Sequence, residues 1–242
     1  MIRHNELIVD GIRTSSFPFK VIVENAPSII LKDSKTQLLE HAGINGAVVE
    51  TNRHRSVISL SFKIYVVKPS EEGLFSFLML FSKEQFWLES EQLKTVRFWC
   101  YKAQVSKVIK DPRGVYELEV TFQCHPTKFF KETDQQVFTQ NGALITQGSA
   151  LAFPRIQIEG VSASETSFTV GDQVIHIEKL QLGETLVMDN NPNKPSFLTA
   201  TGKQIRWSGD FLTLDPSQKQ TIGVVLGAGI QSLQFEIVWG WA

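Results

Sequence analysis

Two pairs of carboxylates are the residues whose spacing could support catalysis. Glu89 and Glu91 lie two residues apart, as do Glu117 and Glu119, and both pairs fall in strand-like segments. Side chains two apart on a strand share one face, and a glycosidase needs two carboxyl groups about 5–9.5 Å apart across a groove. An exposed strand face also accounts for both pairs. A small β-sheet glycosidase or peptidase is therefore one hypothesis, and a surface without catalytic function is the simpler one.

The other reactive side chains form no recognisable motif. Cys100 and Cys124 do not form C-x-x-C, and no local metal-ligand spacing exists among His4, His41, His54, His125 and His176. The glycine-rich stretch GVVLGAGI lacks the GK[ST] of a phosphate loop, and no G-x-S-x-G is present. We therefore expect no enzyme activity, no catalytic residues, no metal and no cofactor.

Charge and hydropathy narrow the classes of partner. The 242 residues carry a net charge of −1, which gives no reason to expect binding of nucleic acid or of an anionic lipid surface. The most apolar run, residues 74–81, is far shorter than the ~20 residues of a membrane-spanning helix. No signal peptide is evident at the N-terminus. We expect both cysteines to be buried free thiols in a protein made in the cytosol.

Alternating apolar residues predict a chain made mainly of β-strands. In residues 56–67, SVISLSFKIYVV, every second side chain from Ile58 to Val66 is apolar. Residues 97–110 and 116–125 alternate in the same way, and the sequence DPRG between them is typical of a turn. We expect these two segments to form a β-hairpin.

One segment predicts a helix and carries more apolar residues than one helix face can bury. Ser70 can cap a helix whose first turn contains Glu71 and Glu72, so we expect a helix over residues 71–84. An isolated domain covers only one side of such a helix. We therefore expect some members of the apolar set to contact a neighbouring subunit: Phe75, Phe77, Leu78, Leu80, Phe81, Phe86 and Trp87. Phe75, Phe81, Phe86 and Trp87 are our candidate interface residues.

Arg53 and Arg55 are two further candidates for the subunit interface. They flank a histidine in the sequence RHR, just before the alternating strand. An arginine can bind a partner carboxylate through two hydrogen bonds. A solvated start of a strand accounts for the same residues.

The second half of the sequence predicts a β-sandwich. Short strands are expected near 155–159, 166–170, 173–178, 184–188, 203–208, 221–226 and 231–239, with turn residues between them. We expect an N-terminal domain over 1–140, a linker over 141–154 and a C-terminal domain over 155–242.

A carbohydrate-binding module that recognises a host cell wall is a second functional hypothesis. Exposed tryptophans on a sandwich can stack on sugar rings, although buried ones that fill a core are commoner. His176 and Trp207 are the candidates in the second half, but no Asn-x-Arg pairing lies near either. Arg206 precedes Trp207, so the two point to opposite faces of a regular strand. We expect no carbohydrate site.

The order of these segments resembles the distal tail (Dit) proteins of siphophages that infect Gram-positive bacteria. The resemblance covers nearly the whole chain and rests on VDGIRTSSFPFKVIVENAPS, ETNRHRSVISLSFKIYV, PSEEGLFSFLMLFSKEQFWLE, the VRFWCYKAQVSKV–YELEVTFQCHPTKF hairpin, NGALITQGSALAFPRIQIEG, LVMDNNPNKPSF and GDFLTLDPSQKQTIGVVLGAGIQSLQFEIVWGW. The family often has glycine where Ser217 or Gln218 follows Asp-Pro. Family members enlarged by a carbohydrate-binding module carry it in a loop, and the loops here are short.

The resemblance implies a fold, an assembly and a set of partners. It implies an N-terminal β-sandwich with one helix and a hairpin that forms a six-membered ring, and a galectin-like antiparallel sandwich. One ring, or two rings back to back, would join the tail tube protein to a tail-associated protein and, in some phages, carry receptor-binding proteins. The protein would then lie at the distal end of the tail in the virion, after assembly in the bacterial cytoplasm.

Overall fold

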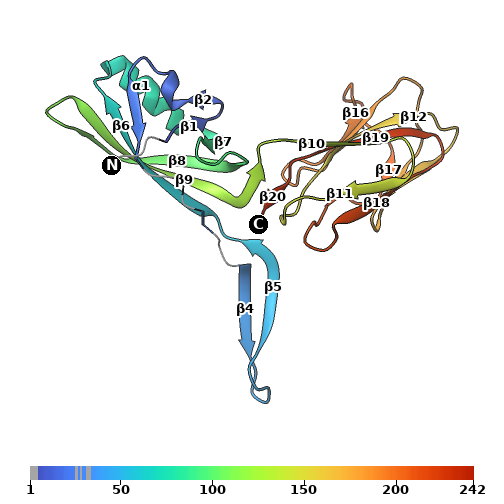
Figure 1. Cartoon of the computed structure of the whole chain (residues 1–242). Helices are drawn as coiled ribbons and strands as arrows, with labels where there is room; N and C mark the ends of the chain where they lie inside the picture. The colour runs from blue at the N-terminus through green and yellow to red at the C-terminus, as the bar shows by residue number, and fades with distance from the viewer. Residues whose placement is uncertain (1–4, 25–26, 28, 31–33) are drawn as a thin grey trace. The chain divides into compact units, whose positions relative to one another are not determined.

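The chain folds into two compact units, Met1–Phe129 and Phe130–Ala242. The computed structural model describes residues 5–24, 27, 29–30 and 34–242 (Figure 1). The division lies before the predicted one, and residues 141–154 are not a linker. They contain strand β11 (Gly142–Ile145), which pairs with β18 (Thr221–Leu226) inside the second unit. Turn-like residues at 141–142 suggested a connection, but the chain there continues a sheet.

The N-terminal unit is built on one antiparallel sheet with the order β2-β1-β7-β8-β9-β6-β3. Its strands are β1 (Leu7–Val9), β2 (Ile12–Arg13), β3 (Lys20–Val23), β6 (Ile58–Val67), β7 (Glu84–Ser90), β8 (Val96–Lys110) and β9 (Val115–Phe130). A short 3-10 turn, η1 (Thr14–Ser16), follows β2. The predicted alternation of β6 is confirmed, since Ile58, Leu60, Phe62, Ile64 and Val66 are all buried.

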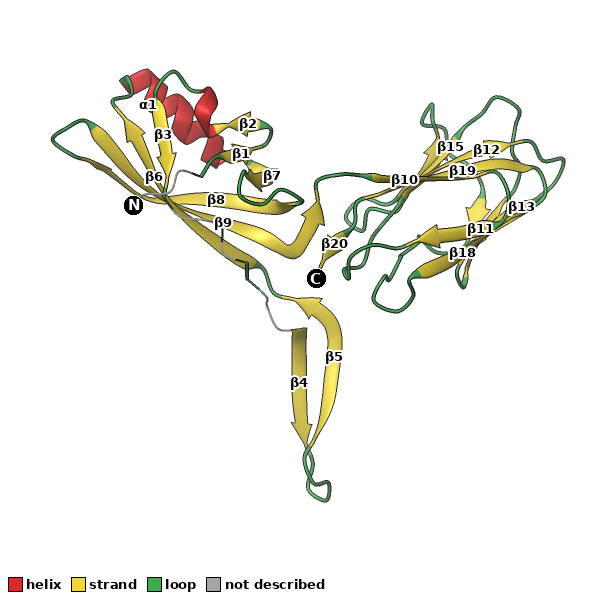
Figure 2. Ribbon diagram, in the orientation of Figure 1, coloured by secondary structure: helices red, strands yellow, loops and turns green. Residues whose placement is uncertain are grey.

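The predicted helix is shorter than expected. Helix α1 (Glu71–Leu78) ends at Leu78 and is followed by the 3-10 turn η2 (Met79–Ser82). The α-helix therefore does not continue to residue 84. Ser70 is the predicted cap, because its hydroxyl accepts a hydrogen bond from the Gly73 N–H at 3.1 Å. Figure 2 shows the helical segment lying along the strands of its unit.

The predicted hairpin of β8 and β9 is confirmed, and its turn is fixed by Asp111. The Asp111 carboxylate accepts hydrogen bonds from the N–H groups of Arg113 and Val115, and Gly114 takes a φ of 82°. The backbone N–H of Gly114 also donates to the Asp111 carbonyl at 3.0 Å. A side chain that binds the backbone two residues on is the usual device for starting such a turn.

A second hairpin, which we call the arm, belongs to the N-terminal unit and was not predicted. It consists of β4 (Ser34–Glu40), β5 (Ala47–Arg55) and the turn at residues 41–46. In the described part of the chain these two strands pair only with each other, as a two-stranded sheet (Figure 1). A two-stranded hairpin alone is at best marginally stable in water.

The C-terminal unit is the predicted antiparallel sandwich. Two five-stranded sheets have the orders β10-β19-β12-β15-β16 and β11-β18-β13-β14-β17. The remaining strands of these sheets are β10 (Asp134–Phe138), β12 (Arg155–Gly160), β13 (Thr166–Val170), β14 (Gln173–Ile177), β15 (Leu186–Asp189), β16 (Ser196–Thr199), β17 (Trp207–Ser208) and β19 (Ile230–Ile237). The short last strand, β20 (Gly240–Trp241), belongs to neither five-stranded sheet and pairs with β9. Strands β10, β11 and β16 were missed. Apolar residues of both sheets form one core that contains the fully buried Trp239.

The two cysteines lie in the core of the N-terminal unit as free thiols. Both are fully buried, and the two Sγ atoms are 2.6 Å apart. The hydrogen bond with Cys124 and burial both raise the pKa of the Cys100 thiol, because each favours its neutral form.

Among the described residues, no helix is long and apolar enough to cross a bilayer.

We expect both thiols to be unreactive in the native protein and reactive after unfolding, since the thiolate is the reacting species. At pH 8, Ellman's reagent should detect no thiol in the native protein and two in denaturant. Detection of none in denaturant would show that the two cysteines are joined.

Candidate functional site

Two of the four apolar interface candidates belong to the core of the N-terminal unit. Phe81 is 3% exposed and Phe86 is 2% exposed, and both rings contact Phe122, with centroids 5.9 and 6.2 Å away. The segment is covered on more sides than expected because its own sheet packs against both α1 and η2. Phe81 and Phe86 are therefore not available to a neighbouring subunit.

Phe75 and Trp87 differ from these two core residues. Phe75 is 59% exposed, and so is its neighbour one helical turn later, Met79, at 64%. Trp87 is half-buried and packs against Trp99 and Phe129 at centroid distances of 4.9 and 5.5 Å. The guanidinium carbon of Arg97 lies 4.0 Å from the centre of the Trp87 ring. Phe75 thus remains free to contact a partner, whereas Trp87 is already stacked within its own unit.

Burial lowers the pKa of the Arg97 guanidinium, and the charge of Glu89 acts in the opposite direction. The Arg97 Nε is buried and has no hydrogen-bond partner in the described structure. The cation–π contact between the Arg97 guanidinium and the Trp87 ring offsets part of the cost of burying this group. Contacts of this kind contribute about 0.5–2 kcal/mol. This cluster explains its own residues without a ligand.

The two candidate arginines lie at the end of β5. The side chain of Arg53 lies outside the described residues. Arg55 is half-buried. Burial lowers the pKa of the Lys128 ammonium, and the positive charge of Arg55 lowers it further. Lys128 is only 6% exposed. The end of the arm nearest β6 therefore carries positive charge.

Members of both carboxylate pairs lie beside basic residues. Glu89 lies in β7, but Glu91 lies beyond its end and contacts Lys94 and Arg13 at 3.7 and 3.6 Å. Glu117 and Glu119 both lie in β9, and Glu117 is 3.9 Å from Lys63. Such lysine and arginine partners fit the simpler hypothesis of a surface without catalytic function.

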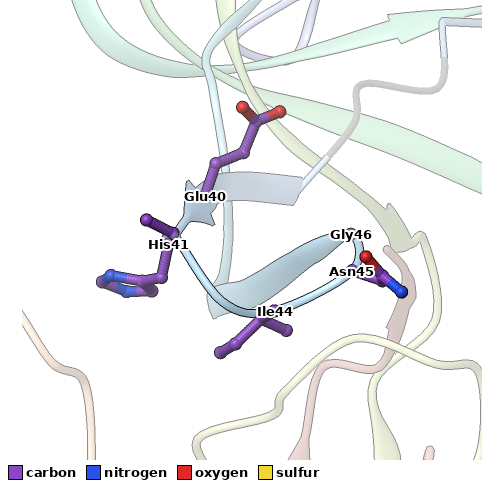
Figure 3. A pocket seen from close by; sticks show the side chains of 6 residues that line it. Glu40, His41, Ile44, Asn45 and Gly46 are labelled. Carbon is purple, nitrogen blue, oxygen red and sulfur yellow. The ribbon is translucent and has the colours of Figure 1, made fainter.

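No described set of three His, Cys, Asp or Glu side chains could hold a metal ion. His4 lies outside the described residues, and nothing is described of the His54 side chain. A hollow at the tip of the arm is lined by Glu40, His41, Ala42, Ile44, Asn45 and Gly46. Figure 3 shows the side chains of Glu40, His41, Ile44 and Asn45 pointing in different directions, so they do not converge on one ligand.

In the C-terminal unit, the candidate sugar-stacking residue Trp207 is half-buried and packs against the core of the sandwich. The Trp207 ring contacts Phe197 and Phe211 at centroid distances of 5.3 and 5.1 Å. The Arg206 side chain is 87% exposed and lies 3.5 Å from Glu178. His176 is 3.2 Å from Glu165. Each of these three side chains therefore contacts a different set of residues within its own unit.

The arm is the exposed apolar feature that the sequence reading missed. Four of its apolar side chains are largely exposed: Leu38 at 66%, Ile44 at 53%, Val48 at 44% and Val49 at 60%. Leu38 pairs with Val49, so their side chains lie on the same face of the hairpin. The signal that would have found it is INGAVV, in which Asn45-Gly46 follows Ile44 and precedes a short apolar run. Gly43 and Gly46 take φ values of 107° and 97° in this turn, which favour glycine.

Comparison with known proteins identifies the fold. No family model matches the sequence, and no curated protein matches it. The Dit protein of phage SPP1, described as a paradigm of the hub adsorption apparatus in phages that infect Gram-positive bacteria, superposes with a TM-score of 0.72. The match covers 97% of this chain and 98% of that one, at 13% sequence identity. The chain has the Dit fold.

A second similar structure comes from the baseplate of phage P2 in its activated conformation with calcium. It superposes with a TM-score of 0.52 and 14% identity, and covers 98% of each chain. The resemblance made from the sequence is thereby confirmed at the level of the fold.

We expect Phe81 and Phe75 to differ in their contribution to stability. Phe81→Ala should lower the free energy of unfolding by about 3–5 kcal/mol, because it leaves a cavity beside Phe122. The matched control Phe75→Ala should change it by less than about 0.5 kcal/mol. Urea denaturation followed by circular dichroism measures both, and equal effects would contradict the burial described above.

We also expect no useful affinity for simple galactosides. Trp207 is half-buried against Phe197 and Phe211, and no Asn-x-Arg pairing lies near it in the sequence to bind the sugar hydroxyls. Calorimetry with lactose at millimolar concentration should give no saturable heat. Saturable heat together with quenching of Trp207 fluorescence would support the cell-wall-binding hypothesis instead.

Proposed function

We propose that this chain is a structural distal tail protein of a phage, which forms the hub between the tail tube and the tail tip. The single observation that carries the proposal is the match to SPP1 Dit over nearly the full length of both chains. A match confined to one sandwich would say little, because sandwiches serve many functions. Here the match extends over 97% of this chain and 98% of the other.

The proposed assembly is a ring of six copies, single or paired back to back, formed by the N-terminal unit. The arm supports this assembly, because it exposes apolar side chains on a hairpin that is too small to be stable alone. A head-to-tail contact satisfies such a surface in every copy only if the ring closes.

The proposed partners follow from the position in the tail. The tail tube protein would bind one side of the ring and a tail-associated protein the other, with receptor-binding proteins attached in some phages. The protein would act without catalysis, metal or cofactor, in keeping with its dispersed carboxylates and the engaged residues around Trp207. Its location would be the distal end of the tail.

Two measurements test the proposal. Light scattering on the full chain should give six times, or twelve times, the mass of one chain, and negative-stain images should show closed rings. Gold-labelled antibodies against the chain should mark the distal end of the tail in the phage that encodes it. Labelling of the head or of no part of the virion would refute the tail function, whatever the solution mass.

A further inference from the structure

One stretch of the large sheet has a strand on one side only. Strand β8 lies between β7 and β9, but β7 pairs with it only from Leu88↔Phe98 to Glu84↔Lys102. Residues 103–110 of β8 therefore have β9 as their sole neighbour in the described sheet. We call residues 103–110 the free edge. A strand edge of this kind presents alternate N–H and C=O groups that can pair with another chain.

The side chains of the free edge are accessible and partly apolar. All residues from 106 to 110 are exposed, with Val108 at 45% and Ile109 at 42%. Lys107 and Lys110 belong to the same stretch, and the Lys110 ammonium lies 5.4 Å from the Tyr116 ring centre. Lysines often protect an edge from unwanted pairing. The exposed Val108 and Ile109 weaken this protection, because they give a partner apolar surface to bury. The two lysines also favour a partner that carries acidic residues.

The arm has the complementary properties. Both of its outer edges are unpaired in the described structure, and β5 has nine residues, enough to span the free edge. Its apolar pairs Leu38↔Val49 and Leu39↔Val48 lie between two acidic residues, Glu40 and Glu50. The half of the arm nearest its turn thus offers aliphatic side chains and negative charge, where the free edge offers aliphatic side chains and positive charge.

We propose that the arm of one copy adds as a further strand to the free edge of the next copy. Backbone hydrogen bonds supply the affinity in such strand addition, and side chains supply the specificity. Each copy contributes one arm and one free edge, which are different surfaces, so the contact is head-to-tail, the kind of contact from which a closed ring is built. This inference rests on the proposed ring and names the two surfaces that build it.

A charge exchange tests the contact. Glu40→Lys with Glu50→Lys makes the arm basic, and Lys107→Glu with Lys110→Glu makes the free edge acidic. Each double variant should weaken self-association by more than about tenfold, because it places like charges opposite one another. The quadruple variant, which carries both exchanges, should recover most of the association. The control, Lys179→Glu with Lys194→Glu, changes two exposed lysines of the C-terminal unit and should associate like wild type.

Cross-linking gives an independent measurement. Both native cysteines are fully buried, so cysteines introduced at Leu38 and Val108 should react selectively with a bismaleimide. Leu38→Cys/Val108→Cys should give a ladder up to the full ring, and a mixture of the two single variants should stop at dimers. The control pair Leu38→Cys/Val174→Cys, in which Val174 is an exposed residue of the C-terminal unit, should give no ladder.

The outcomes separate this inference from the proposed function. Sedimentation of every charge variant as the wild-type ring, with no arm-to-edge cross-link, would refute the arm contact and leave the ring intact. A wild-type monomer at all micromolar concentrations would overturn both. Circular dichroism checks that each variant is folded. If the folded double variants lose association and the folded quadruple variant does not recover it, the proposed pairing is also refuted.

Discussion

The constraint on which the structure depends is that every strand edge must be paired, covered or made unattractive. The C-terminal unit meets it internally. Its edge strands β10 and β11 belong to different sheets, and the Gln136 side chain joins them: its amide donates to the Ile145 carbonyl at 2.8 Å and accepts from the Ile145 N–H at 2.9 Å. At the opposite edge β17 has only two residues. Gln173 holds the backbone of Thr213 in the same two-point manner as Gln136 holds Ile145. These side chains occupy backbone groups that another protein would otherwise pair with.

The N-terminal unit meets the same constraint only in part. Its core is an aromatic cluster in which Phe77 contacts Phe81, Phe81 contacts Phe122, and Phe122 contacts Phe62, all with centroids less than 6 Å apart. This cluster holds α1 and η2 against the sheet and accounts for almost all the apolar surplus of the helical segment. The unit is therefore complete in its core and incomplete at its edges. Residues 103–110 and both strands of the arm retain unpaired edges in the described structure.

The sequence predicted what depends on local pattern and missed what depends on three-dimensional surroundings. Alternation located β6, and Asp-Pro-Arg-Gly located the β8–β9 turn, because both signals act over a few residues. β16 was hidden by the turn-like residues before it, among which Asn190 is in fact buried and bridges the Pro154 carbonyl and the Leu212 N–H, both at 2.6 Å. Interface residues were harder still. Phe75 and Phe81 differ by six positions in one apolar segment, yet Phe81 is buried against Phe77 and Phe122 whereas Phe75 is exposed. Only the tertiary packing distinguishes the two.

The difference between the two units bears on how an assembly protein can be built. A hairpin with no third strand and no core of its own is only marginally stable, and assembly would supply what the arm lacks. In the proposed ring, the unpaired edges of the N-terminal unit would join the copies through a defined pair of surfaces. The arm and the free edge would set a direction around that ring, and Glu40 and Glu50 facing Lys107 and Lys110 would favour that direction over pairing of like edges. On this view the exposed apolar side chains of the arm and the lysines of β8 have one physical explanation, which is the specificity of a strand addition between copies.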